Sequence, residues 1–185
     1  MSNEILNNVI RHGNFTSSQI YRLCKSDRSG KGFGAPALTY IEEKRFERRL
    51  KRSLDTGAHS RDMAWGNFLE QRVFDLIGLK YSLLSDETKM HPTIEGWSGS
   101  TDVLSEDTSG DVKCYALKNF CAYATVLEKQ DIELLKKEFD KEYWQLVSNA
   151  IINKVPFAEA ILYAPYQSEL EEIRQMAFDY EGEDL

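Results

Sequence analysis

Two short stretches in the middle of the chain carry the residues best suited to chemistry. The first, 99–103, contains Asp102, and the second, 110–114, contains Asp111 and Lys113. Because Asp111 and Lys113 are two residues apart, their side chains would project from the same face of a strand. Two carboxylates and a lysine are the groups that hard-cation phosphodiester chemistry uses. A hairpin with a solvated polar face is the alternative interpretation, since charged residues make up 29% of the chain.

The surrounding elements predict how these residues are positioned. Residues 105–110, which separate the two stretches, are all Ser, Glu, Asp, Thr or Gly, a turn composition that favours paired strands on either side. A helix predicted over about 61–77 carries Glu70 at the border of its apolar stripe. Glu70 is therefore either a surface side chain or a third acid directed toward Asp102 and Asp111.

Periodicity predicts two helices in the first third of the chain. Thr16 and Gln19 form a capping-box pattern at the start of a helix that ends near Cys24. A glycine-rich basic loop follows over 26–36. One side of the second helix is then marked by Leu38, Ile41, Leu50 and Leu54. Its arginines alternate with glutamates, which indicates a solvated helix face more than a track for phosphates.

The last third predicts one long helix and one strand. The charged helix spans about 131–153, and a buried strand spans 158–164. The order of helices and strands predicts an α/β fold.

Length and composition predict one domain of ordinary globular character. The chain has 185 residues, of which 42% are apolar. It has no apolar run near the roughly 20 residues of a membrane span and no signal-peptide pattern, so we expect a cytoplasmic protein. The three cysteines, which we expect to be reduced packing residues, are Cys24, Cys114 and Cys121. A formal charge of −7 confines any DNA contact to local basic patches.

Five short segments occur in a particular order along the chain. They are Arg11–Ser18, Arg28–Lys31, Met63–Glu70, Asp102 with Asp111–Lys113, and Tyr143–Gln145. In order and spacing they resemble the lambda-exonuclease and YqaJ-like family of alkaline exonucleases. This family is a branch of the viral recombinases within the PD-(D/E)XK nuclease superfamily. The similarity extends from about Arg11 to Pro165.

The resemblance implies a restriction-endonuclease-like PD-(D/E)XK core with a central mixed sheet flanked by helices. We expect a single nuclease domain over 1–185, with N-terminal helices and a basic loop (1–60), a catalytic core (61–165) and a C-terminal segment with an acidic tail (166–185). The implied activity is a 5′-to-3′ exonuclease on duplex DNA ends that uses one or two Mg²⁺ ions, with Mn²⁺ as a substitute. The implied partners are a single-strand annealing protein and further copies of the chain in a homotrimer. A phage or prophage origin is also implied.

The resemblance also implies roles at the chemical centre. Asp102, Asp111 and the carbonyl of Val112 match the family's metal ligands. Lys113 matches its catalytic lysine, and Glu70 matches a helical acid that can serve a second metal. Carboxylate and carbonyl oxygens are the ligands that Mg²⁺ prefers, which agrees with these assignments.

Further positions match the family's 5′-phosphate-binding residues and its fourth motif. Arg11 and Ser18 fall where the family binds the 5′ phosphate, and a guanidinium near a hydroxyl at a helix N-terminus is a general anion site. Gln145 matches a catalytic position of the fourth motif, whereas Tyr143 is shifted relative to the family's tyrosine. Thr101 stands where the superfamily has proline.

Two other functions fit the same residues. The first is a PD-(D/E)XK endonuclease or resolvase, because the shared core fixes phosphodiester hydrolysis but not whether a DNA end is required. The second is a non-catalytic DNA-end-binding module of a recombination complex. Nucleotide binding at 28–32 is rejected, because this segment lacks the spacing of a phosphate-binding loop.

Overall fold

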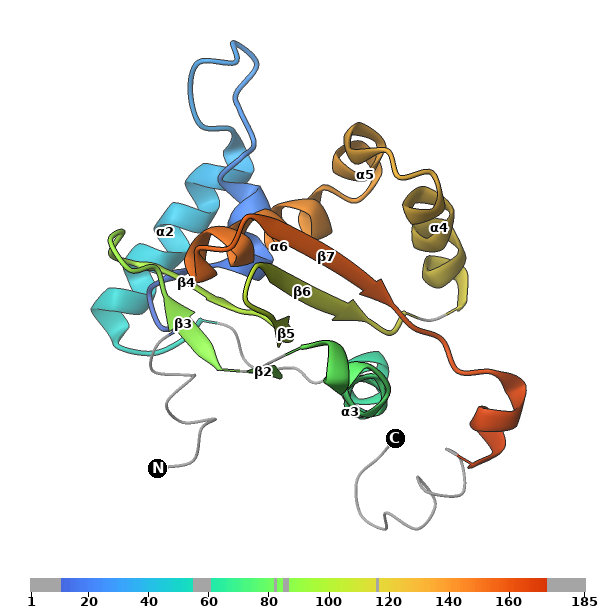
Figure 1. Ribbon diagram of the computed structural model, residues 1–185. Helices are drawn as coiled ribbons and strands as arrows, with labels where there is room; N and C mark the ends of the chain where they lie inside the picture. The colour runs from blue at the N-terminus through green and yellow to red at the C-terminus, as the bar shows by residue number, and fades with distance from the viewer. Residues whose placement is uncertain (1–10, 55–60, 82, 85–86, 116, 173–185) are drawn as a thin grey trace.

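A computed structural model describes residues 11–54, 61–81, 83–84, 87–115 and 117–172 (Figure 1). The strands are β1 (Phe15–Thr16), β2 (Leu83–Leu84), β3 (Thr88–Met90), β4 (Trp97–Ser100), β5 (Val103–Leu104), β6 (Thr108–Lys113) and β7 (Phe157–Leu162). The α-helices are α2 (Ala35–Leu50), α3 (Arg61–Ile77), α4 (Leu117–Glu128), α5 (Ile132–Glu138) and α6 (Asp140–Asn153), and the 3₁₀ helices are η1 (Ser17–Arg22) and η2 (Gly78–Lys80). The predicted acidic tail at the end of the chain lies outside the described residues.

The strands form two small mixed sheets. One has the order β1-β4-β3, in which β1 is parallel and β3 antiparallel to β4. The other has the order β2-β5-β6-β7, in which only the β6–β7 pair is parallel. The chain between β6 and β7 contains α4, α5 and α6, which provide the long connection that a parallel pair needs. The predicted α/β class is confirmed.

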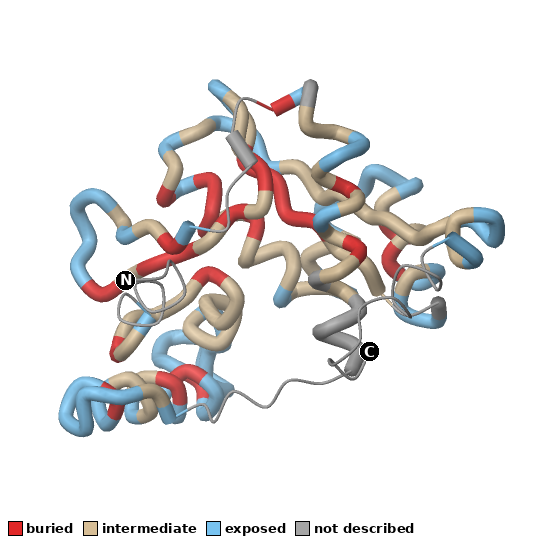
Figure 2. Tube along the Cα trace, turned by 90° about the horizontal axis from the view of Figure 1, so that it is seen from below, coloured by how far each residue is buried: buried red, intermediate tan, exposed pale blue. Residues whose placement is uncertain are grey.

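The predicted helix over 61–77 and the predicted strand pair are both confirmed. Helix α3 has the expected bounds, and β5 and β6 pair with each other, but β6 begins at Thr108, so the turn is shorter than the predicted 105–110. Val73 of α3 is buried in one cluster with Val103 and Val112 of the sheet. Figure 2 shows buried residues along the central strands, while exposed residues lie on the outer helices and loops. This packing brings α3, and with it Glu70, to the strands that carry the candidate chemistry.

Helix α6 packs against η1 and β4 through small and polar side chains. The Ser148 hydroxyl lies 2.8 Å from that of Ser17, and the Asn149 amide donates to the Ser100 carbonyl at 2.7 Å. Gly99 permits this approach, since a Cβ atom there would lie 2.1 Å from the Ser17 hydroxyl. The close contact fixes the end of β4 relative to α6.

Two predictions in the last third of the chain are wrong. The long helix over 131–153 is interrupted at Phe139, whose backbone (φ −132°, ψ 54°) is not helical. The capping side chain of Asp131 begins α5, and a second helix, α6, follows the interruption. The strand at 157–162 is not buried, because β7 lies at the edge of its sheet and Phe157 is 59% exposed. Helix α4 and strand β3 were not predicted.

The N-terminal helices also differ from the prediction. The segment after Thr16 is a 3₁₀ helix, and the Thr16 hydroxyl makes no capping bond, because it contacts Tyr40 instead. Helix α2 buries Ala37, Tyr40 and Glu47, so the leucines expected to mark its apolar side are largely exposed. The aromatic contact between Tyr40 and Phe15 sets this orientation.

The cysteines agree only in part with the expectation that all three are reduced packing residues. All three cysteines are free, but Cys24 and Cys121 are exposed, so the prediction that they are packing residues is wrong for these two. Cys114 is partly buried against the sheet cluster.

Within the described residues, no helix combines the length and the apolar character needed to cross a membrane.

Candidate active site

The β5–β6 hairpin brings Asp102 and Asp111 together. Asp102 immediately precedes β5, and its backbone N–H donates to the Gly110 carbonyl at 3.1 Å. Its carboxylate turns back to β6, where the Val112 N–H donates to Oδ2 at 2.6 Å. The Thr101 hydroxyl donates to the Gly110 carbonyl at 2.9 Å. The local backbone of both strands therefore fixes the Asp102 carboxylate.

Asp111 is buried, with 3% of its surface exposed, and both of its oxygens are paired. Oδ1 accepts a hydrogen bond from the Gln145 side-chain amide at 2.6 Å. Oδ2 lies 2.6 Å from the Lys113 ammonium. Three of the predicted site residues are thus in direct contact, with Asp111 in the centre.

The carboxylates of this cluster outnumber its cations. Burial, then the Asp111 carboxylate and then the Glu70 carboxylate raise the pKa of Asp102 to about 8. Burial disfavours the charged form of Lys113, but the Asp111 carboxylate outweighs burial, and the pKa of Lys113 lies above its ordinary value. Lys113 is therefore a stable ammonium, while Asp102 holds a proton at neutral pH and becomes a second carboxylate only as the pH rises through about 8.

Glu70 lies on the α3 side of the same cluster. Its side chain is half-buried, and its charge acts on Asp102 and on Cys114. Burial, followed by the Glu70 and Asp102 carboxylates, raises the pKa of the Cys114 thiol to about 12. Cys114 is therefore a neutral neighbour of the acids and not a nucleophile.

Two residues of the cluster were not predicted. The Tyr115 hydroxyl donates to Glu142 at 2.8 Å, and Glu142 lies close enough to help raise the pKa of Lys113. Their positions in the sequence could have indicated both residues. Tyr115 follows Lys113 at the same two-residue spacing that separates Asp111 from Lys113, and Glu142 is one helical turn before Gln145.

The donor set suits Mg²⁺ or Mn²⁺. Among the residues that the structure describes, no group of three or more His, Cys, Asp and Glu side chains is arranged to hold a metal ion. Mg²⁺ is nevertheless commonly held by one or two carboxylates with water and phosphate oxygens. Asp102 and Asp111 supply two carboxylates. The Val112 carbonyl points to the same side of β6 as its N–H, which binds Asp102. A bound cation would offset the burial and the repulsion that keep Asp102 protonated, and so would favour its carboxylate form.

Arg11 and Ser18 lie in different environments near the end of β4. The Arg11 guanidinium donates to the hydroxyls of Ser100 at 3.0 Å and Thr88 at 3.3 Å. Ser18 lies in η1, with its hydroxyl 3.4 Å from that of Thr16. Arg11 therefore lies beside the strand end that precedes Asp102, while Ser18 belongs to the contacts of η1 and α2.

Tyr143 and Gln145 point to different sides of α6. The Tyr143 ring packs edge-on against Trp144, and the Lys136 ammonium of α5 lies 5.6 Å from its centroid. Gln145, in contrast, bonds Asp111. Tyr143, whose position differs from that of the tyrosine in the family that the sequence resembles, thus has its ring against α5.

The structure has the fold of an alkaline exonuclease. It is similar to the alkaline exonuclease LHK-Exo from Laribacter hongkongensis, with a TM-score of 0.66 and 15% identity over 95% of this chain and 89% of that chain. It is similar to LHK-Exo in complex with dAMP, with a TM-score of 0.67 and 16% identity over 90% of this chain and 77% of that chain. No protein-family model and no curated protein matches the sequence. At these identities the likeness shows the fold alone, so the activity depends on the site.

Proposed function

We propose that the protein is a metal-dependent deoxyribonuclease of the PD-(D/E)XK type, which degrades duplex DNA from its 5′ ends. The observation that carries this proposal is the cluster of Asp102, Asp111 and Lys113, in which burial and the neighbouring acids raise the pKa of Asp102 to about 8. A structural ion pair needs one acid for each base, whereas this site holds several acids around one lysine. The fold shared with an alkaline exonuclease supports the same class of activity.

Asp102, Asp111 and the Val112 carbonyl would hold a Mg²⁺ ion, and Glu70 would serve a second one. A bound ion supplies a lowered pKa for its water and positive charge beside the scissile phosphate. Mn²⁺ takes the same oxygen ligands and would substitute.

The protein's own groups orient the reactants. The Lys113 ammonium would donate hydrogen bonds to a water or phosphate oxygen and so orient it. Gln145 keeps the Asp111 carboxylate in one orientation through its hydrogen bond to Oδ1. Glu142 holds the Tyr115 hydroxyl at the edge of the cluster.

Arg11 would bind the 5′ phosphate of the end being degraded. Its guanidinium is exposed and lies beside Ser100, two residues before Asp102. A guanidinium forms charge-assisted bonds with phosphate, which would favour phosphorylated ends. Ser18 is a second candidate phosphate ligand. The product would carry a 3′ overhang, the substrate of a single-strand annealing partner in phage-type recombination.

The test compares three substrates in Mg²⁺: a linear duplex with 5′ phosphates, the same duplex with 5′ hydroxyls, and a closed circle. We expect release of mononucleotides from linear DNA, fastest from phosphorylated ends, with the circle intact. Lys113→Ala, purified in the same way, should be inactive, which excludes a contaminating nuclease. Cleavage of the circle would favour an endonuclease, and binding without metal-dependent cleavage would favour a DNA-end-binding module.

A further inference from the structure

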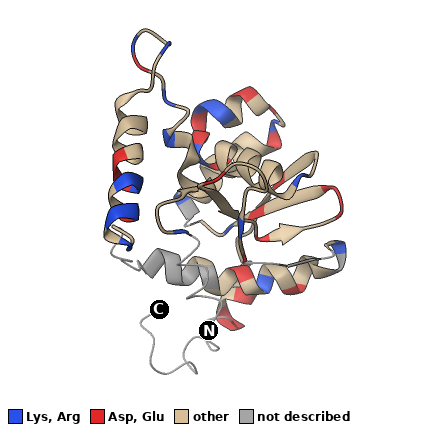
Figure 3. Cartoon of the chain, turned by 90° about the vertical axis from the view of Figure 1, so that its left-hand side faces the viewer, with Lys and Arg blue, Asp and Glu red and all other residues tan. Residues whose placement is uncertain are grey.

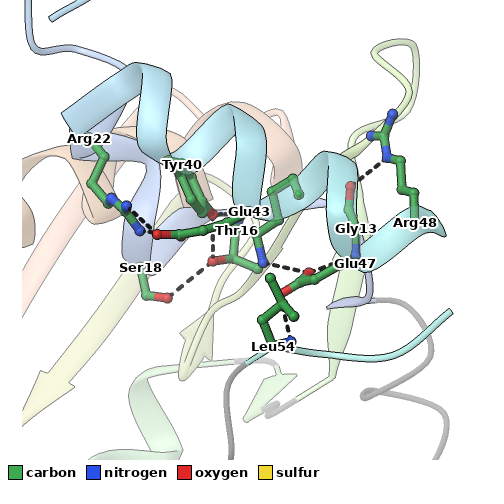
Figure 4. A network of polar contacts seen from close by, with 10 residues as sticks. Gly13, Thr16, Ser18, Arg22, Tyr40, Glu43, Glu47, Arg48 and Leu54 are labelled. Carbon is green, nitrogen blue, oxygen red and sulfur yellow. Dashed lines mark hydrogen bonds and ion pairs between the residues drawn. The ribbon is translucent and has the colours of Figure 1, made fainter. Parts of the chain in front are cut away.

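Helix α2 is hydrogen-bonded to the turn that carries Arg11. Residues 11–14 form a turn closed by a hydrogen bond from the Asn14 N–H to the Arg11 carbonyl at 3.2 Å. Its central residue, Gly13, has a φ of +68°, which favours glycine. The Gly13 N–H donates to Glu47 at 2.9 Å, and the Gly13 carbonyl accepts from the Arg48 Nε at 2.7 Å. Two consecutive residues of α2 thus hold both polar groups of one backbone unit (Figure 4).

Glu47 is built into this contact. It is 3% exposed, and its carboxylate also accepts from the Lys44 ammonium at 2.9 Å and the Leu54 N–H at 3.2 Å. Burial raises the pKa of Glu47, but the bonds from Lys44, Gly13 and Leu54 outweigh burial, so its pKa lies below the ordinary value. A carboxylate is therefore present at neutral pH.

Arg48 joins the Arg11 turn to the loop before β4. Its side chain packs so closely on Gly13 that a Cβ atom there would lie 2.3 Å from Arg48 Cγ. The Arg48 guanidinium also covers Gly96, where a Cβ atom would lie 2.5 Å from Nη2. The Gly96 carbonyl accepts from the Phe15 N–H at 2.7 Å, which continues the same chain segment into β1. Arg48 therefore fixes the turn relative to β4, whose last residue contacts Arg11.

Glu42, Arg45 and Arg49 of α2 lie outside this contact. Acidic and basic residues alternate along the helix (Figure 3). Glu42 and Arg45 pair with each other on its exposed side, and the Arg49 guanidinium lies 5.9 Å from the Phe46 ring centroid. Glu42 and Arg49 therefore provide controls of the same residue types on the same helix.

We propose that Glu47 and Arg48 are positioning residues that hold Arg11 where it recognises a 5′-phosphorylated DNA end. The inference rests on the proposed role of Arg11 in the nuclease. Without the two bonds to Gly13, the turn would lose its fixed conformation. The Arg11 guanidinium would then spend less time beside the end of β4. The preference for a phosphorylated end would fall, while the hydrolytic cluster on β5 and β6 would be unaffected.

The test measures binding of a duplex with a 5′ phosphate and the same duplex with a 5′ hydroxyl in EDTA, so that it does not depend on hydrolysis. Charge-assisted bonds of Arg11 to phosphate predict about tenfold tighter binding of the phosphorylated end by the wild type. Glu47→Ala and Arg48→Met should each lower this ratio to about threefold or less. Glu47→Gln, which keeps an acceptor for the Gly13 N–H, should restore part of it. Glu42→Gln and Arg49→Met should leave it unchanged.

A double variant separates positioning from general weakening. If Glu47 acts through Arg11, adding Glu47→Ala to Arg11→Ala should not change the ratio further. Thermal unfolding identifies variants that fold, and Arg48→Met carries the test if Glu47→Ala does not fold. A wild-type ratio in folded Glu47→Ala and Arg48→Met would overturn the inference. So would equal binding of both ends by the wild type, or an equal loss for both ends in the variants. Failure of the nuclease proposal would be seen separately, as absence of Mg²⁺-dependent hydrolysis.

Discussion

Two buried carboxylates in this protein have opposite surroundings. Glu47 and Asp111 are each 3% exposed, and each pairs with a lysine. Around Glu47, two backbone N–H groups complete the hydrogen bonding, and its pKa is lowered. Around Asp111, a second acid, Asp102, has a pKa raised to about 8. Donors surround the carboxylate of Glu47, whereas Asp111 lies beside a second acid that is disfavoured in its charged form.

This difference separates a structural network from a binding site. A buried acid that stabilises the fold is matched by donors, as Glu47 is. An excess of acids destabilises the fold, and it persists where a ligand supplies the missing charge.

The largest effect is expected from Asp111→Asn. Loss of its charge removes a candidate metal ligand and the partner of Lys113, so kcat on linear duplex DNA in Mg²⁺ should fall by about 10²–10³-fold. Glu106→Gln is the matched control, because Glu106 is exposed in the turn of the same hairpin. An Asp111→Asn protein with near wild-type activity would remove this cluster from the reaction.

Neutralising one acid in each region should change stability in opposite directions. Glu47→Gln loses the ion pair with Lys44 and leaves donors unmatched, so unfolding should become easier by about 1–3 kcal/mol. Asp102→Asn removes repulsion by Asp111 and Glu70 and should raise the melting temperature in EDTA at pH 8.5. Urea and thermal unfolding measure both variants. A loss of stability in both would mean that the two networks have the same role.

The pH dependence of stability should show the same difference. Since folding raises the pKa of Asp102 to about 8, the native state binds this proton more tightly than the unfolded chain does. Its contribution is complete at low pH and is lost as the pH rises through about 8, because burial and then the Asp111 and Glu70 carboxylates disfavour the charged form. In EDTA, the melting temperature of the wild type should therefore fall relative to that of Asp102→Asn between about pH 5 and pH 8. Parallel melting curves for the two proteins would contradict this assignment.

The smallest effect is expected from Tyr143→Phe. The Tyr143 ring contacts Trp144 of the same helix and Lys136 of α5. Loss of the Tyr143 hydroxyl should therefore change the rate of hydrolysis less than about twofold. Gln145→Ala, which removes the amide that holds Asp111, is the comparison and should slow hydrolysis clearly. A larger defect in Tyr143→Phe than in Gln145→Ala would reverse the assignment of the fourth motif.

Local sequence patterns predicted the parts of the site that depend on neighbours in the chain. The strand pair could be predicted from the spacing of Asp111 and Lys113 and from the turn before them. The contact of Gln145 with Asp111 joins α6 to β6, and only the family resemblance suggested it. Glu142 and Tyr115 meet across the same long separation and were missed.

Burial of charge explains the main error in the fold. Hydrophobic periodicity assigns the leucines of α2 to the interior, but the helix instead buries Tyr40 and Glu47. A buried glutamate is stable only when donors reach it, here from Lys44 and Leu54 nearby and from Gly13, 34 residues away. No local pattern records the donor from Gly13. At the break, the Phe139 ring lies 4.8 Å from that of Tyr123 in α4, a contact that helical periodicity does not record either.

Binding of Mn²⁺ to the DNA-free protein, followed by electron paramagnetic resonance at pH 8.5, shows whether Asp102 and Asp111 form a metal centre. We expect the wild type and Glu47→Gln to bind Mn²⁺ and Mg²⁺ to displace it, whereas the Asp102→Asn, Asp111→Asn double variant should not bind it. Equal Mn²⁺ binding by the wild type and the double variant, or no binding by the wild type, would contradict the claim that these acids form a metal centre.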